Sequence, residues 1–246
     1  MRLLPPRFKQ RGFYLPWFGA GGGSPPATDP YISYVIQLTH FDVEATGAFT
    51  QTIGPNAFAN GGGNAALDTG QKAFGIGSAG LSTADINATT NAAYTIGSAD
   101  FAMEFWVRPS SVSGAQVYFD GRPGSDGAYP AIYASGADLF YYVSAGNQIS
   151  ASGAMSATTW QYICVARTSG TTRMYVGVLG GGTAAKVGSD YSDGTTYLQM
   201  PLRLGRSVFA SGQFAGNFDD FRLTIGHGRG YTGSSIPVPT AAFPDT

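Results

Sequence analysis

The sequence predicts an all-β protein, an antiparallel two-sheet sandwich that follows an extended N-terminal arm. Short runs rich in β-branched and aromatic residues recur about every 8–12 residues, with Gly, Asn and Asp turn signals between them. No stretch sustains the spacing of an amphipathic helix. Among the 246 residues are 36 Gly, which suit many turns, and 16 Phe, 14 Tyr and 3 Trp, which can fill a core.

Residues 1–30 are predicted to form an extended anchoring arm and linker, separate from a single domain at residues 31–246. Four basic residues fall within the first 11 positions, and no acidic residue precedes Asp29. Prolines at 5, 6, 16, 25, 26 and 30 favour extended backbone and oppose helix. The apolar stretch 13–18 is short and contains Pro16, which argues against a signal peptide. The residue types enriched at interface cores predict that the arm binds a partner through Arg2, Arg7, Phe8, Lys9, Arg11, Phe13, Tyr14, Trp17 and Phe18.

The strands are expected where β-rich runs stand between turn signals. The clearest is 101–107, which Pro109 ends because proline cannot donate to a sheet ladder. The other expected strands are 31–41, 116–120, 131–134, 139–143, 160–167, 173–178, 202–205 and 218–225. Residues 54–66, rich in Gly, Asn and Ala, are expected to form a loop, and residues 83–93 at most a short helical turn.

The run 160–167 carries apolar residues on both of its alternating faces. A strand of this kind is covered on both sides. The predicted core residues are Phe101, Trp106, Trp160, Phe218 and Phe221.

Several of these segments resemble one known family. Residues 98–109 (SADFAMEFWVRP), 160–167 (WQYICVAR) and 216–224 (GNFDDFRLT) are similar to strands of laminin G-like, concanavalin A-like jelly rolls. Residues 38–42 and 173–176 resemble two further strands, and the ending at 228–244 resembles the branch found in bacteriophage virion proteins. The resemblance implies a jelly roll over about residues 31–245.

Catalytic groups are sparse in the sequence. The superfamily includes glucanases, but Glu44 and Glu104 are the only glutamates and lie in different runs. Asp219 and Asp220 are adjacent in a strand and are expected to point to opposite faces, so they would not pair across a substrate. A Ser-His-Asp triad could use only His40 or His227, and the sequence contains no Gly-x-Ser-x-Gly motif that would supply the serine. We therefore expect no catalytic residues and no enzyme.

Asp42 and Asp219 are the candidate metal ligands. The family resemblance implies that a structural Ca²⁺ could lie near the sandwich rim, and Ca²⁺ takes oxygen ligands. The alternative is that these carboxylates bond Arg167, Arg222 or backbone N–H groups. No other cofactor is expected.

Charge and hydropathy bear on the partners. The net charge is −1, which argues against nucleic acid, and no apolar run reaches 18 residues, which argues against a membrane span.

Two functions are predicted from these features and the resemblance. The first is a non-enzymatic virion structural protein (decoration, head-fibre or tail-associated), made in the host cytoplasm without a signal peptide and placed on the virion surface. Its arm would bind capsid or tail proteins or copies of itself.

The second is a glycan-binding adhesin that contacts host polysaccharide. Aromatic side chains offer flat apolar faces with polar edges, and they gather between residues 129 and 142. The predicted glycan platform is Tyr129, Tyr133 and Tyr141, with Phe140 and Tyr142 beside them.

Overall fold

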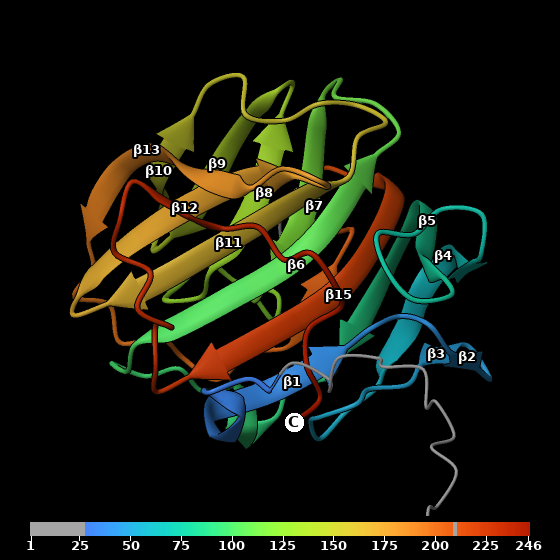
Figure 1. Cartoon of the computed structure of the whole chain (residues 1–246), viewed down its shortest axis with the longest axis horizontal. Coiled ribbons are helices and arrows are strands. Elements are labelled where there is room, and N and C mark those ends of the chain that lie inside the picture. The colour runs from blue at the N-terminus through green and yellow to red at the C-terminus, as the bar shows by residue number, and fades with distance from the viewer. Residues whose placement is uncertain (1–27, 209–210) are drawn as a thin grey trace, which may run out of the picture.

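The computed structural model describes residues 28–208 and 211–246. The chain folds into two layers of antiparallel strands (Figure 1). The front layer contains β1 (Val35–Thr39), β15 (Ala215–Ile225), β6 (Phe101–Pro109), β11 (Gln161–Thr168), β12 (Thr171–Val178), β13 (Thr183–Ser192) and β16 (Ser235–Pro237). The rear layer contains β10 (Gly146–Ala151), β9 (Asp138–Val143), β8 (Ala131–Ser135), β7 (Ala115–Asp120), β14 (Leu202–Leu204) and β5 (Ser78–Ala88). At one side lie β2 (Glu44–Ala45), β3 (Ala48–Phe49) and β4 (Phe58–Asp68), and η1 (Ile32–Tyr34) and η2 (Ala92–Tyr94) are single 3₁₀ turns.

Both layers belong to one hydrogen-bonded sheet that curls over on itself. The turning point is β5, which pairs with β14 near its C-terminal end and with β15 nearer its N-terminal end. At the opposite side, β13 packs on β10 at Gly188, where an added Cβ would stand 2.5 Å from Ile149 Cγ2 and 2.8 Å from the Ser150 carbonyl oxygen. The predicted all-β sandwich is confirmed.

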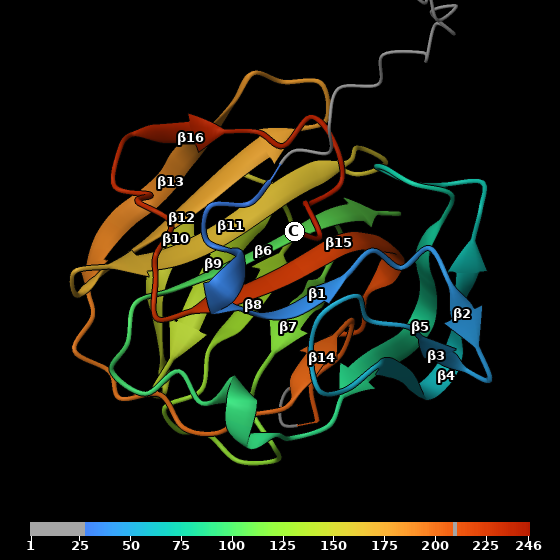
Figure 2. The same ribbon diagram turned by 60° about the horizontal axis from the view of Figure 1, so that its bottom comes forward.

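The predicted core residues are all buried, but they occupy two separate clusters. Phe101, Phe218 and Phe221 lie between the two layers. Trp106 and Trp160 lie instead on the outer face of the front layer, packed with Ile236, Val238 and Phe243 of the C-terminal segment. Figure 2 shows this segment running through β16 and across the front layer to the C-terminus. The C-terminal segment therefore explains why β11 is buried on both faces, as its sequence predicted.

The expected loop at 54–66 is wrong. Most of it belongs to β4, which pairs with β5 over most of its length, and two register shifts fall between Asn60 and Asn64. Gly62 and Gly63 have positive φ values, which glycine tolerates. The hydrogen bonds that define β4 come from the backbone, so its exposed glycines and asparagines left no period-2 pattern to read. Strands β2, β3, β5, β10, β13 and β16 were also not predicted, and the run at 31–41 begins with η1.

The start of the domain differs from the predicted boundary at residue 31. Asp29 is buried, its backbone N–H donates to the Thr246 carbonyl oxygen, and its carboxylate binds Arg222 and Arg229. The sandwich thus includes the end of the predicted linker. All nine predicted arm residues fall at positions 1–27, outside the described residues. Within residues 28–208 and 211–246, no helix is long and apolar enough to cross a membrane.

Candidate functional site

A hollow of about 290 Å³ opens on the outer face of β7, β8 and β9 in the rear layer. Alternation along these strands sends Ile132, Leu139 and Tyr141 into the core and turns Tyr133 and Tyr142 outward. We call this the aromatic hollow; it is lined by Ala115, Val117, Arg122, Ala131, Tyr133, Tyr142 and Ser211. Val117 and Ala131 are buried and form an apolar floor between the two half-buried tyrosines.

The two tyrosines are held in place by neighbours on the same face. The ring of Tyr133 stacks on Phe140, with 4.9 Å between ring centroids, and its hydroxyl donates to Asn147 Oδ1 at 2.9 Å. The guanidinium of Arg122 lies 5.0 Å from the ring centroid of Tyr142, within cation–π range. The Tyr142 hydroxyl donates to Asp126 Oδ2 at 2.9 Å. Both rings are therefore preorganised before any ligand arrives.

Two carboxylates surround the Arg122 guanidinium. Arg122 Nε donates to Asp120 Oδ1 and Arg122 Nη2 to Asp120 Oδ2, both at 2.8 Å, in a buried bidentate pair. Burial alone would lower the pKa of Arg122, but Asp120 and, more weakly, Asp126 raise it. Burial and the Asp126 carboxylate raise the pKa of Tyr142, which keeps its hydroxyl protonated at neutral pH.

The predicted glycan platform is only partly assembled. Tyr133 lines the aromatic hollow, as does Tyr142 beside it. Tyr141 is fully buried, with its hydroxyl 2.6 Å from the Tyr197 hydroxyl, so its place in the platform is corrected. Tyr129 packs against the core cluster and does not line the hollow. Period-2 alternation through 131–135 and 139–143 could have separated the outward tyrosines from Tyr141. Arg122 was missed, since it follows β7 and carries no motif.

The two candidate metal ligands bind the segment 73–77 through its backbone. Asp42 Oδ1 accepts the N–H groups of Ile76 and Gly77, at 2.6 and 2.9 Å. Asp219 Oδ2 accepts those of Ala73 and Phe74, at 2.8 and 3.0 Å. In the described parts of the chain, no group of three or more His, Cys, Asp or Glu side chains could hold a metal ion. The contacts made are those of the backbone N–H alternative.

The prediction that Asp219 and Asp220 point to opposite faces of their strand is wrong. A bulge in β15 lies between Asp219 and Arg222, with Asp220 at a φ of 49°. Both carboxylates consequently reach the outer face of the front layer, where Asp220 Oδ2 accepts the Phe243 N–H at 2.8 Å. Burial, and the nearby Asp220 and Asp42 carboxylates, raise the pKa of Asp219 to about 8.

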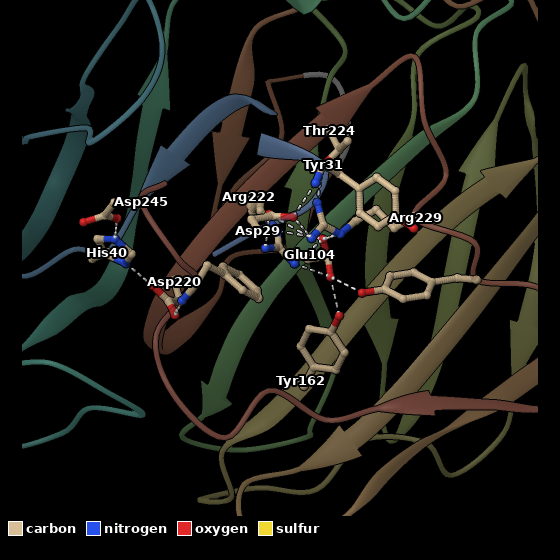
Figure 3. Close-up of polar contacts among 12 residues, drawn as sticks. Asp29, Tyr31, His40, Glu104, Tyr162, Asp220, Arg222, Thr224, Arg229 and Asp245 are labelled. Carbon is tan, nitrogen blue, oxygen red and sulfur yellow. Dashed lines mark hydrogen bonds and ion pairs between the residues drawn. The ribbon is translucent and has the colours of Figure 1, made fainter. Parts of the chain in front are cut away.

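His40 joins the C-terminal segment to β15 (Figure 3). Its Nδ1 contacts Asp220 Oδ1, and its Nε2 lies 2.7 Å from Asp245 Oδ1. Burial alone would lower the pKa of His40, but the two carboxylates raise it to about 9. At neutral pH His40 is an imidazolium between two carboxylates, which is not the state of a general base.

The titration of His40 leads to a prediction about stability. Its pKa rises from 6.5 to about 9 on folding, so its contribution is complete below pH 6.5 and is lost as pH rises through 9. We expect denaturant titrations at pH 6, 7.5 and 9 to show a falling free energy of unfolding, and His40→Gln to reduce that fall. Asp219, whose pKa rises from 3.8 to about 8, contributes in the same direction, and Asp219→Asn is expected to remove its share. An unchanged slope in His40→Gln would contradict the imidazolium bridge.

A buried charge network lies beside this bridge on the same face (Figure 3). Arg222 holds Glu104 through Nε and Nη2, each at 2.9 Å, and donates from Nη1 to Asp29 at 2.9 Å. Arg229 Nη2 donates to both Asp29 oxygens at 2.8 Å, while Tyr162 donates to Glu104 at 2.6 Å. Burial alone would raise the pKa of Glu104, but the two arginines and Tyr162 lower it overall. Glu104 is therefore an ionised structural partner.

Comparisons with known proteins agree with this architecture. A comparison with curated proteins finds no match. Among solved structures, Domain 4 of AbnA, a GH43 extracellular arabinanase from Geobacillus stearothermophilus in complex with arabinotriose, is 17% identical, with a TM-score of 0.50 over 78% of this chain and 92% of that one. The binding domain of botulinum neurotoxin DC in complex with rat synaptotagmin II is 13% identical, with a TM-score of 0.53 over 79% of this chain. The same binding domain in complex with SialylT is 14% identical, with a TM-score of 0.53 over 79% of this chain.

This chain spans only 48% of those two neurotoxin chains, and at these identities the likeness shows the fold alone. The sequence itself carries the family assignment. A family model described as the Concanavalin A-like lectin/glucanases superfamily (Laminin_G_3) matches residues 78–224, more than half of the chain. This match covers the strands from β5 through most of β15, including the aromatic hollow and Glu104. The chain therefore belongs to the Laminin_G_3 family of the concanavalin A-like lectin/glucanase superfamily.

Proposed function

We propose that this chain is a non-enzymatic binding module that contacts carbohydrate through the aromatic hollow. The observation that carries the proposal is the pair of preorganised, outward tyrosines over an apolar floor, with polar atoms at their edges. Concave sites that join aromatic faces to a few fixed polar groups are typical of small-molecule recognition. A structure with the same fold supports it, because Domain 4 of AbnA is in complex with arabinotriose.

Replacing Tyr133 by alanine tests this proposal. The change removes the ring that stacks on Phe140 and forms one wall of the hollow. We expect at least about a tenfold loss of affinity, or about 1.4 kcal/mol, for the glycans that the wild-type protein retains on an array. The matched control is Tyr34→Ala, because Tyr34 is exposed and does not line the hollow. Equal glycan binding by the two variants would contradict the proposal.

We also propose that a bacteriophage virion carries this module, as a decoration, head-fibre or tail-associated protein attached by residues 1–27. The support is the arm composition and the phage-like ending at 228–244. The described chain begins next to Arg222 and Arg229 on the outer face of the front layer, whereas the hollow opens on the rear layer.

Removing residues 1–27 tests the attachment. Because Asp29 belongs to the sandwich, the shortened chain should start at Thr28. We expect it to fold with the wild-type melting temperature and to be absent from purified particles. A full-length variant with Trp17 and Phe18 replaced by alanine should show a partial loss of incorporation. Normal copy number of the shortened chain in particles would show that the jelly roll itself makes the attachment.

A further inference from the structure

The two tyrosine hydroxyls at the aromatic hollow have a fixed donor pattern. The Tyr142 hydroxyl donates its hydrogen to Asp126 Oδ2, and the Tyr133 hydroxyl donates to Asn147 Oδ1. Each tyrosine has one hydroxyl hydrogen, so both oxygens can offer only acceptor lone pairs to a ligand. A ligand hydroxyl can donate to them. A carboxylate, sulfate or phosphate oxygen has no hydrogen to donate and would leave them unpaired, which costs binding free energy.

The charges around the hollow also disfavour an anionic ligand. Among the described residues that line the hollow, Arg122 is the one cation, and Asp120 accepts hydrogen bonds from its Nε and Nη2 in a buried bidentate pair. Asp126, bonded to Tyr142, adds a second carboxylate near the guanidinium. One positive and two negative charges leave a net charge of −1 in this group. An anionic ligand would meet that negative charge and an arginine whose fork is already in use.

From these two observations we infer that the aromatic hollow selects an uncharged, hydroxyl-rich sugar and rejects acidic sugars such as uronic, sialic or sulfated units. The inference rests on the proposed carbohydrate function and names its ligand class. At about 290 Å³, the hollow is near the lower limit for small-molecule sites, about 300 Å³, so it suits a single sugar unit better than a long chain. The apolar floor of Val117 and Ala131 fits the C–H face of such a ring.

The test uses sugar pairs that differ only at C6. Titration calorimetry of the full-length protein would compare methyl glucoside with methyl glucuronide, and methyl galactoside with methyl galacturonide, at low ionic strength. We expect the neutral member of at least one pair to bind at least about tenfold more tightly than its acidic partner. The low ionic strength matters because salt screens charge effects at an open site.

Asp126→Asn identifies the source of the discrimination. Asparagine retains an oxygen that can accept the Tyr142 hydroxyl but removes the negative charge. We expect the variant to bind the acidic sugar severalfold more tightly, so that the ratio of neutral to acidic affinity falls. The matched control is Asp138→Asn, because Asp138 bonds Ser152 and Gly153 and contacts neither tyrosine of the hollow. It should leave both affinities unchanged.

The outcomes separate the inference from the function beneath it. If acidic sugars bind as tightly as neutral ones while Tyr133→Ala abolishes both, the inference is overturned and the carbohydrate function stands. If the neutral preference exists but Asp126→Asn leaves acidic binding unchanged, the charge argument is overturned. If none of the four sugars binds, or if binding is indifferent to Tyr133→Ala, the proposed site falls together with the inference.

Discussion

Replacement of Glu104 by glutamine is expected to destabilise the fold by about 3–5 kcal/mol, the range for removing one partner of a buried ion pair. Glu104, Asp29, Arg222 and Arg229 form a group of two carboxylates and two guanidiniums, each 9% exposed or less. Glutamine keeps the shape but leaves one buried positive charge uncompensated. Chemical denaturation at pH 7 measures the loss.

Two further variants make the result specific to charge. Glu44→Gln is the matched control, because Glu44 is partly exposed and its carboxylate accepts the Leu67 N–H at 2.7 Å. That substitution should change stability by less than about 1 kcal/mol. Replacing Glu104 and Arg222 together by methionine removes one charge of each sign and should recover part of the loss. Equal stability of the Glu104→Gln and Glu44→Gln proteins would show that the network contributes nothing through its charges.

The second large effect is expected at Phe221, where Phe221→Ala should cost about 3–5 kcal/mol. Its ring contacts those of Phe58 on β4, Phe105 on β6 and Phe119 on β7, with centroid distances of 5.3, 6.4 and 6.2 Å. These contacts join the front layer, the rear layer and the flanking strands. Truncation to alanine would leave a cavity between β4, β6 and β7. A strand that moved to fill this cavity would lose its packing against the other two.

Phe221→Leu is the comparison for this site, because it keeps most of the volume and should cost less than about 1.5 kcal/mol. Thermal and denaturant unfolding of the two variants would be measured together. If alanine and leucine destabilise equally, aromatic ring contact rather than filled volume governs the site. If Phe221→Ala leaves the free energy of unfolding unchanged, Phe221 does not hold the two layers together as its contacts indicate.

The sequence alone determined the fold class and much of the core. In β6 and β11 the apolar side-chain pattern and the burial coincide, so 101–107 and 160–167 were readable as strands. Where a strand is held mainly by backbone hydrogen bonds, as in β4, no pattern marks it. Tyr141 and Tyr142 differ by one position and lie on opposite faces of β9. Alternation separates the two faces, and the pairing of β9 with β8 brings Tyr142 beside Ala131 in the hollow.

Only the tertiary structure determined which buried charges pair with one another and which residues form the aromatic hollow. Asp29 and Arg222 are 193 positions apart in the sequence but form a hydrogen-bonded ion pair in the folded chain. Arg122 lies over the ring of Tyr142 because β7, β8 and β9 are neighbours in the rear layer. The bulge at Asp220 brings the Asp219 and Asp220 carboxylates to one face, although strict alternation places them on opposite faces. Periodicity reports whether a residue faces the core or the solvent. The partner of a buried charge or an outward ring depends on which distant strands are neighbours, and that is fixed only when the whole sheet has closed.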